Sequence, residues 1–519
     1  MSRHRPLVTW ALAATAAVAA LAVVVFAEPL ARSLLTSGVS VFPGRESAEY
    51  YTAQLRRSGL AWFVLLPSLV VLSGVVTRGL VGHNTPGASR PSYAVAVAAV
   101  VVLAAAALPR TPTGDEPAYL AMAGSIAHRG SFDVSGGDAS LHRSPAARPG
   151  ENRSVHSVGL PLILAVPALL GGETACRLST SLLALALLAT LATGVSTGSD
   201  SDAGRLVLAA LACSFPVAAY AALALPEIAG ALALWLTYRD AIDGRRASAS
   251  SALAIALLPW LHVRFVPGAA LLAIWALVRA ARSRAARPLA ASLVASLAAS
   301  LLLMGALHQR WFGSPSPFAM WRGSGDLVSF RDTPVGILGL LVDQQYGLLV
   351  WAPLFLIAPI GLLEMARGRR RHAAACVALI AVTTGPGILH AWWGGWSPAA
   401  RFLVAVTGPL VLLLLEGVAY LRRSESGRRI VACLAGVQLA IGALVVVVPG
   451  KLYGTFEEAP RNYWLDLLGR ATGLEVAGLL PSLRQHPDAT SLGHAAALVA
   501  AWLLACWWVW RRKQPRPAH

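Results

Sequence analysis

Residues 289–307 read LAASLVASLAASLLLMGAL, nineteen positions without a charged side chain. A helix rises about 1.5 Å per residue, so this run nearly matches the roughly 20 residues that cross the hydrocarbon core of a bilayer. The stretch predicts a membrane-spanning helix, and the rest of the chain repeats its character.

The composition points the same way. Of 519 residues, 56% are hydrophobic and 13% are charged, which is far from a soluble domain. The net charge of +18 would suggest nucleic acid in a soluble protein. Here the basic residues stand in short clusters between apolar runs, a pattern that encodes membrane topology. We therefore predict an all-α, polytopic integral membrane protein without a nucleic-acid partner.

Apolar runs of spanning or near-spanning length predict about fourteen transmembrane helices. The first could be a signal peptide, but it exceeds the usual signal core, so a retained helix is expected. The runs that begin at Ile228, Ala252 and Val266 are short for a straight span. The predicted runs are 7–27, 60–76, 93–108, 174–195, 206–225, 228–238, 252–261, 266–278, 289–307, 347–363, 373–389, 402–421, 430–448 and 495–510.

Alternate counting from a cytoplasmic amino terminus places the short arginine-rich loops on the inside, as the positive-inside rule requires. These loops hold Arg239 to Arg246, Arg279 to Arg287, Arg367 to Arg371, Arg422 to Arg429 and Arg511 to Arg516. If the run 158–170 were counted as a span, the later arginine-rich loops would fall on the outside. The run is short and contains two prolines, which favours a helix lying in the outer interface. The long outer loops are 28–59, 110–157, 309–343 and 449–493. We expect a multi-pass protein of the plasma (inner) membrane with its site on the extracytoplasmic side.

Three regions follow from this topology. Residues 1–92 are an N-terminal addition of transmembrane helices, and residues 93–421 form the core, which includes the acidic outer loop 110–157. Residues 422–519 hold the C-terminal helices, the outer loop 449–493 and a basic cytoplasmic tail. The five cysteines lie in or beside apolar segments without CxxC spacing, so they are interpreted as small core residues.

An acidic pair stands at the mouth of an apolar run, in the stretch Thr113–Leu120 (TGDEPAYL). Asp115 could accept a proton from an incoming hydroxyl, with Glu116 orienting it, or the two could hold a cation such as Mg²⁺ or Mn²⁺. The alternative is a helix start with Asp115 as N-cap and Pro117 in the first turn.

Six stretches on the predicted outer side form an ordered set: 114–120 (GDEPAYL), 156–161 (HSVGLP), 225–227 (LPE), 258–265 (LPWLHVRF), 343–349 (DQQYGLL) and 392–402 (WWGGWSPAARF). Together they resemble the bacterial membrane glycosyltransferases of the GT-C superfamily, which include protein O-mannosyltransferase-like enzymes and aminoarabinose transferases. The resemblance runs from about residue 111 to 421. In that family the acidic loop usually follows the first apolar run, whereas here it follows the third.

The resemblance implies an all-helical fold with interfacial helices in the first long outer loop and a sugar donor carried on polyprenyl phosphate. It gives Asp115 the role of base or metal-associated residue, with Glu116 beside it. Sugar transfer also needs a cationic clamp for the leaving phosphate. Arg264, between two apolar half-helices, and Arg401, on the outer side where positive charge is disfavoured, are the candidates. Arg264 could instead pair with Glu227 or Asp343.

The remaining candidates are substrate-binding residues, each with a structural alternative. His262 could hold the acceptor or a cation, or be a hydrogen-bonded structural histidine. Glu227 could complement a helix dipole, Asp343 could cap a helix, and His156 could be a solvated loop residue. The tryptophans of 392–396, among them Trp393 and Trp396, could stack on sugar rings or form an interfacial belt.

We therefore predict a membrane glycosyltransferase, hexosyl or pentosyl, that moves a sugar from a polyprenyl-phosphate donor to an extracytoplasmic glycan, lipid or protein in the cell envelope. Single displacement would invert the anomeric centre. A transporter or lipid-linked sugar flippase is the alternative, although no inverted repeats or ionisable residues at helix midpoints are evident. A member of the fold that only binds a lipid-linked sugar is the third possibility.

Overall fold

The computed structural model describes residues 18–19, 22–36, 47–49, 51–52, 55, 114–134, 142–195, 201–212, 215–243, 248–323, 329–389, 393–394, 397–447, 462–484 and 487–512. Within these ranges every element of regular structure is helical, apart from two isolated β-bridges in the segment 133–154. The predicted all-α class is confirmed for the described part of the chain. The predicted runs 60–76 and 93–108, and most of region 1–92, lie outside it.

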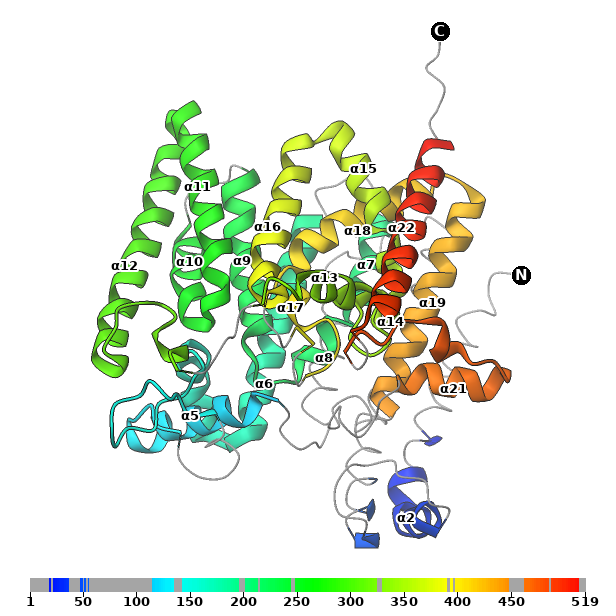
Figure 1. The fold of residues 1–519 in the computed structure, drawn as a ribbon, viewed down its shortest axis with the longest axis horizontal. Coiled ribbons are helices and arrows are strands. Elements are labelled where there is room, and N and C mark those ends of the chain that lie inside the picture. The colour runs from blue at the N-terminus through cyan, green and yellow to red at the C-terminus, as the bar shows by residue number, and fades with distance from the viewer. Residues whose placement is uncertain are drawn as a thin grey trace.

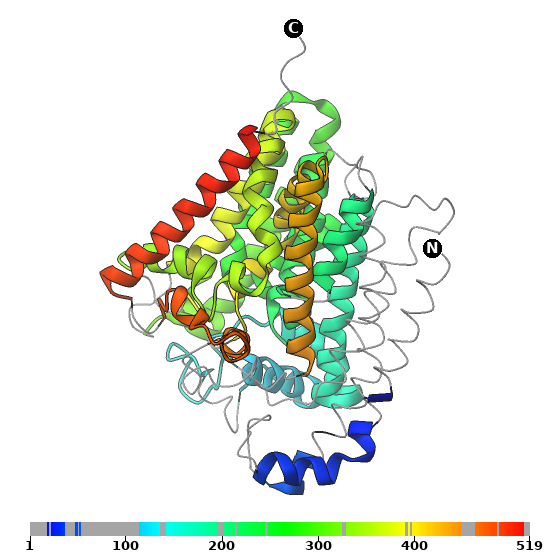
Figure 2. The same cartoon turned by 90° about the vertical axis from the view of Figure 1, so that its right-hand side faces the viewer.

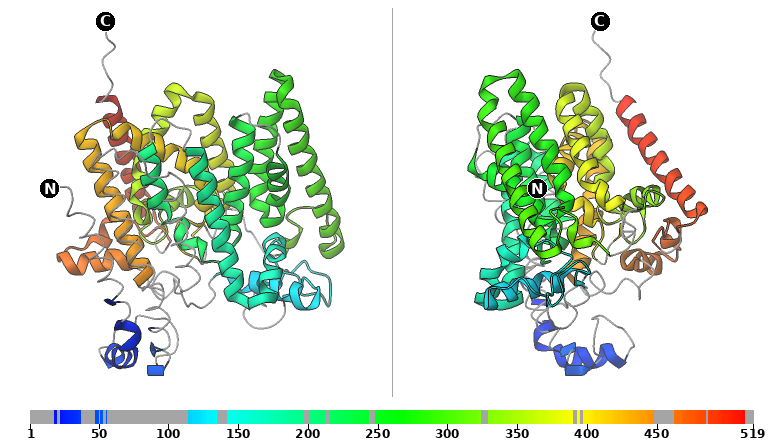
Figure 3. Two further views of the ribbon diagram at one scale, coloured as in Figure 1. Left: turned by 180° about the vertical axis from the view of Figure 1, so that it is seen from behind. Right: turned by 60° about the vertical axis from the view of Figure 1, so that its left-hand side comes forward.

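Long helices stand side by side in the molecule (Figures 1 and 3). α10 packs between α9 and α12, α11 packs on α12 and α16, and α15 packs on α18. Short helices lie across the lower end in Figure 1, where α5 contacts α6. The long elements are α6 (Gly159–Val195), α9 (Pro226–Asp243), α10 (Ala249–Leu261), α11 (Val266–Arg282), α12 (Arg287–Phe312), α15 (Ala358–Gly368), α16 (Arg370–Ile388), α18 (Thr407–Leu421), α19 (Glu425–Val447) and α22 (Ala489–Arg512).

The basic loops share one end of this arrangement. The junctions of α11 with α12 and of α15 with α16, and the carboxyl end of α22, lie at the top of Figure 1. α5 (Glu116–Arg129) and α21 (Tyr463–Thr472) lie at the opposite end, and α2 (Ala27–Thr36) lies below them (Figures 1 and 2). The predicted grouping of the arginine-rich loops on a single side is therefore visible, while the side that faces the cytoplasm stays a prediction.

Four described helical segments are long and apolar enough to cross a membrane: 159–192, 263–282, 284–312 and 489–512. Three shorter apolar helices are α10, α13 (Thr333–Val342) and α18. Several apolar helices of this kind are consistent with a membrane protein. The total of about fourteen spans stays a prediction.

Three predicted runs are broken in the structure, which corrects the sequence analysis. Run 206–225 becomes α7 (Ser201–Ala212) and α8 (Val217–Ala221), with Pro216 directly before α8. Run 347–363 becomes α14 (Leu348–Trp351), the 3-10 helix η5 (Pro353–Ile357) and α15, and run 402–421 becomes α17 (Arg401–Val404) and α18. Proline lacks the N–H that an uninterrupted helix needs, which explains the breaks at 216 and 353. Conversely, α13 and α21 form within segments predicted as outer loops.

The predicted interfacial segment 158–170 is the first part of α6. Non-helical backbone at Gly171 and Gly172 separates it from the second part. Leu162, Val166 and Leu170 are 45%, 63% and 79% exposed, whereas Leu160 and Leu164 are fully buried. This spacing puts the exposed apolar residues on one face of the helix, as an interfacial helix would require.

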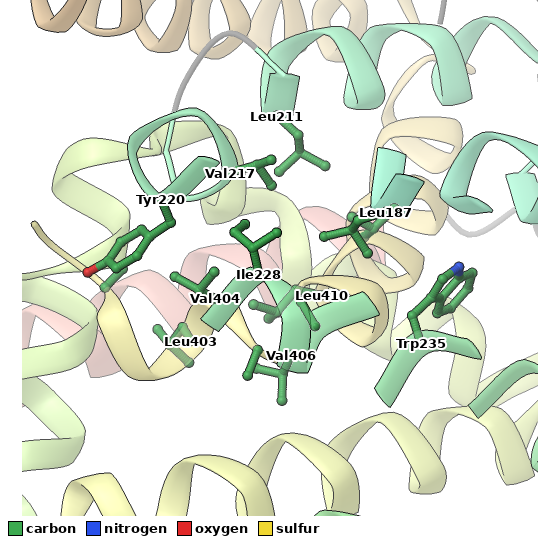
Figure 4. Packing of buried hydrophobic residues seen from close by; sticks show 14 of the residues in the cluster. Leu187, Leu211, Val217, Tyr220, Ile228, Trp235, Leu403, Val404, Val406 and Leu410 are labelled. Carbon is green, nitrogen blue, oxygen red and sulfur yellow. The ribbon is translucent and has the colours of Figure 1, made fainter. Parts of the chain in front are cut away.

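One large apolar cluster fills the middle of the bundle. Figure 4 shows side chains of α6, α7, α8, α9, α17 and α18 meeting there, among them Leu187, Ile228, Val404 and Leu410. Gly361 of α15 lies against the backbone of α18, where a Cβ would clash with the carbonyl of Leu413. Small residues allow this close helix packing. The cluster fixes the backbones that carry the polar residues described next.

Candidate active site

Asp115 stands directly before α5, in the position of an N-cap. Its side chain makes no capping hydrogen bond, while Pro117 occupies the first turn. The carboxylate instead accepts a hydrogen bond from the Arg401 guanidinium, 2.6 Å from Oδ2. The Asp115 side chain is 23% exposed, against 6% for Arg401. The helix start that the sequence indicated is therefore present, but the carboxylate is directed to another partner.

Arg401 links Asp115 to a second carboxylate, which in turn binds a second arginine. Its Nε donates to Oε1 of Glu227 at 2.7 Å, and Arg264 donates to the same oxygen at 2.6 Å. Glu227 is fully buried at the start of α9, and its Oε2 has no hydrogen-bond partner among the described residues. Two guanidiniums and two carboxylates thus share one network, in which the formal charges cancel. We call Asp115, Arg401, Glu227 and Arg264 the charge network.

This network answers the question that the sequence left open for Arg264. Its guanidinium pairs with Glu227, which was the structural alternative, and it also lies over the rings of Phe265 and Phe402 at 4.9 and 4.8 Å. The positive charges of both arginines are balanced by carboxylates of the protein. A phosphate at either one would have to displace a carboxylate.

Glu116 does not share the surroundings of Asp115. It is fully buried, and its Oε1 accepts hydrogen bonds from Arg177 Nε at 3.1 Å and from the backbone N–H of Ala224 at 2.9 Å. These contacts tie α5 to α6 and to the segment before α9. Neighbouring residues at a helix start differ by about 100° in direction, so adjacency in sequence does not bring the two carboxylates together.

Two histidines lie beside Asp115. Nε2 of His156 is 2.9 Å from Nδ1 of His142 and 3.8 Å from Oδ1 of Asp115. The candidate ligand atoms of Asp115, His142 and His156 all lie within 4.8 Å of one another. Two imidazoles and one carboxylate are a donor set that suits a transition ion such as Zn²⁺ better than Mg²⁺, because imidazole is preferred by the later divalent metals.

The electrostatics of this cluster fix two protonation states. Burial raises the pKa of Asp115, but the Arg401 guanidinium and the nearby histidines outweigh that effect and hold the pKa well below its usual value. Burial lowers the pKa of His156 to about 4, although the Asp115 carboxylate opposes the shift. At neutral pH Asp115 is ionised and His156 is neutral, which is the state that each needs to bind a cation.

Several other predicted site residues have structural contacts. Nδ1 of His262 accepts a hydrogen bond from the backbone N–H of Arg264 at 3.2 Å and so caps the turn that carries it. Asp343 accepts backbone hydrogen bonds from Gln345 and Tyr346 on one oxygen and from residues 483 and 484 on the other. These contacts favour the structural alternatives for both residues.

The outer aromatic loop is described only in part. Trp393 is 3% exposed and packs against Gly339 of α13, where a Cβ would clash with its ring. A buried ring of this kind is packed as a core residue. Trp392 and Trp396 lie outside the described residues.

A small recess of about 20 Å³, room for about one water molecule, adjoins the cluster on the side of His156. It lies between the segment after α5, the loop 153–158 and the carboxyl end of α12. The polar residues of its lining include Arg153, Ser157 and His308, and the aromatic ones include Phe132, Trp260 and Trp311. Gly159 keeps this side compact, because a Cβ there would lie 2.6 Å from the carbonyl oxygen of Trp260.

His142 and Arg177 are parts of this arrangement that the sequence analysis missed. His142 lies in the same outer loop as His156, fourteen positions earlier, and bridges near residues 143 and 154 bring the two strands of the loop together. A pair of histidines within an acidic outer loop was the available signal. Arg177 could have been noticed as a charge inside an apolar run.

Comparison with known proteins gives little further definition. No family model matches the chain, and no curated protein matches it. A solved structure that matches is an archaeal oligosaccharyltransferase, AglB from Archaeoglobus fulgidus, in complex with an inhibitory peptide and a dolichol-phosphate. The TM-score is 0.41 at 13% identity, and the match covers 72% of this chain and 57% of that one. The chain thus spans little more than half the length of that structure.

Proposed function

We propose that this protein is a membrane glycosyltransferase that moves a sugar from a polyprenyl-phosphate donor to an extracytoplasmic acceptor, with inversion of the anomeric centre. The observation that carries the proposal is the surroundings of Asp115. This carboxylate is partly exposed, kept ionised by Arg401, and placed beside two histidines at the end of the bundle where α5 lies.

The protonation states refine the expected roles. A general base works best when its pKa is near the working pH, and the pKa of Asp115 lies far below it. Asp115 is therefore better suited to hold a cation and to orient the acceptor hydroxyl than to take its proton. The neutral ring of His156 can bind a metal ion, but its pKa of about 4 makes it a weak general base as well.

A divalent ion would be held by Asp115, His142 and His156. Bound there, it would supply positive charge for the departing phosphate, which neither neutralised arginine of the charge network offers. Glu116, expected beside Asp115 as a ligand, is replaced in this proposal by the two histidines.

Metal analysis of the purified protein tests whether Asp115, His142 and His156 bind an ion. We expect about one equivalent of a transition ion in the wild type and its loss in His142→Ala, whereas unchanged content would refute the assignment.

The transfer reaction itself is tested in membranes with radiolabelled sugars on polyprenyl phosphate. The variants are Asp115→Asn and, as a matched control, Asp332→Asn, a carboxylate at the start of α13 with no side-chain capping bond. Protein levels are equalised before the assay. Loss of transfer only in Asp115→Asn would support the proposal.

Equal transfer from Asp115→Asn and the wild type would remove Asp115 from the chemistry. Binding of donors without transfer to any acceptor would instead favour the alternative, a flippase or a protein that only binds lipid-linked sugar. Movement of the labelled donor across vesicle membranes would then separate these two.

A further inference from the structure

We infer that the junction between α11 and α12 binds the phosphate headgroup of an anionic phospholipid. The junction lies at the end of the bundle that carries the arginine-rich loops, and α12 stands at the edge of the bundle (Figures 1 and 3). α11 ends at Arg282, the 3-10 helix η3 (Arg284–Ala286) follows, and α12 begins at Arg287. Lipid binding here is independent of glycosyl transfer, so the inference goes beyond the proposed function.

Three arginines of this junction have no carboxylate to balance them. Arg282, Arg284 and Arg287 are exposed, and none of them forms an ion pair or a side-chain hydrogen bond with a described residue. The first turn of α12 contains no acidic residue. The junction therefore presents three positive charges within six positions of the chain.

The other polar groups near the junction are engaged elsewhere. Arg279, in the last turn of α11, donates to the backbone carbonyls of Asp240 and Ala241 at 3.3 and 2.6 Å and so caps the end of α9. The carboxylate of Asp240 accepts a hydrogen bond from Ser248 at 2.5 Å. Within the described residues, the charge of the three exposed arginines is left to a partner outside the chain.

A second arginine-rich region at the same end is arranged differently. Arg367 and Arg423 both pair with Glu364, at 3.8 and 3.0 Å, and Arg369 pairs with Glu416. The positive-inside rule explains why basic residues gather at this end. It does not explain why three arginines of one junction lack the carboxylates that these other arginines have.

The helix surfaces next to the three arginines are apolar and exposed, as the acyl chains of a lipid require. On α11, Ile274, Leu277 and Val278 are 56%, 48% and 45% exposed. Steps of four residues lead from Ile274 through Val278 to Arg282, so these side chains share one face of the helix. On α12 the exposed positions in the same steps of four are Arg287, Ala291, Ala295 and Ala299.

A phosphodiester headgroup fits this combination of charge and apolar surface. Arginine presents a planar fork of N–H donors that matches two phosphate oxygens, and it stays charged at physiological pH. Basic clusters at a membrane surface attract the anionic lipids of the leaflet that they meet. A zwitterionic lipid carries a cation of its own, which the arginines repel. The expected ligand is therefore a phospholipid with a net negative charge, such as phosphatidylglycerol.

Retention of lipids by the detergent-purified full-length protein tests the inference. The protein is incubated with equal amounts of phosphatidylglycerol and phosphatidylcholine that have the same acyl chains, and native mass spectrometry counts the lipids that remain bound. We expect about tenfold more phosphatidylglycerol than phosphatidylcholine. Equal retention would overturn the inference. Displacement of phosphatidylglycerol by millimolar inorganic phosphate would also overturn it, because the site would then bind the free ion.

Two triple variants locate the binding at the junction. Arg282→Gln/Arg284→Gln/Arg287→Gln should lower the preference for phosphatidylglycerol about tenfold. The same three positions changed to lysine keep the charge and the topology signal, so this variant should keep most of the preference. A glutamine variant that binds like the wild type, or a lysine variant that loses as much as the glutamine variant, would overturn the inference.

The matched control removes three paired arginines from the same end, as Arg367→Gln/Arg369→Gln/Arg423→Gln. The net charge falls by the same amount, but the preference should be unchanged because these side chains already face carboxylates. An equal loss in the control would mean that net charge alone attracts the lipid, and the inference would fail. Melting temperatures close to that of the wild type show that each variant folds.

Discussion

Arg401 offers the sharpest test of the charge network, because it is the residue shared by both carboxylates. Arg401→Gln removes the positive charge between Glu227, which is fully buried, and Asp115, which is 23% exposed. Breaking a buried ion pair typically costs about 3–5 kcal/mol. With an unfolding entropy of about 2.1 cal/mol/K per residue, 1 kcal/mol corresponds to about 1 °C for a chain of this length, so the melting temperature should fall by about 3–5 °C.

A second substitution tests whether the loss comes from an unbalanced charge. Adding Asp115→Asn to Arg401→Gln leaves Glu227 and Arg264 as one balanced pair, 2.6 Å apart. The double variant should therefore regain about 1–2 kcal/mol, because residues in one network couple by about 0.5–3 kcal/mol. Melting is followed in detergent at pH 7 with EDTA present. The exposed Arg331→Gln serves as the control.

Either of two results would refute this account of the network. Melting of Arg401→Gln within 1 °C of the wild type would mean that the buried charges tolerate separation. Additive losses in the double variant would mean that Asp115 and Arg401 do not depend on each other.

Three further expectations concern single residues. Glu116→Gln should lower stability by about 3 kcal/mol through the lost pair with Arg177, yet transfer per folded molecule should persist, which a combined melting and activity assay can check. For His156 the pKa of about 4 lies below the usual 6.5, so the unfolded chain binds more protons between these values and stability falls as pH drops from 6.5 to 4. The fall attributable to His156 is on the order of 3 kcal/mol and should be absent from His156→Gln in EDTA, as pH-dependent melting will show. Asp343→Asn turns a donor toward two backbone N–H groups and should cost about 2–4 kcal/mol, with faster hydrogen exchange in 481–484 as the measurement.

The sequence indicated the helical class, because the length of an apolar run is a local signal, and an acidic pair beside such a run made Asp115 a candidate site residue. It could not separate Glu116 from Asp115, since which carboxylate turns inward depends on Arg177, sixty-one positions away. The pairing of Arg264 with Glu227 was predicted only as an alternative. Before the fold is known, a bound phosphate and a carboxylate of the protein explain a buried arginine equally well.

Other differences have visible causes. The prolines at 216 and 353 mark the breaks in two apolar runs, but run length alone conceals them. The position of His142 beside His156 depends on how the loop folds back, which no spacing rule specifies. Asp343 reaches residues 483 and 484, a contact that only the tertiary structure brings about.

The order of synthesis gives the charge network a further consequence. Asp115, Glu227 and Arg264 are all made before Arg401, which follows Asp115 by 286 positions and Glu227 by 174. A nascent chain that ends before α17 therefore holds Asp115 without its cation. The geometry of the site becomes complete only when most of the bundle has been inserted, so truncated or stalled chains would carry an acidic loop that is not yet anchored.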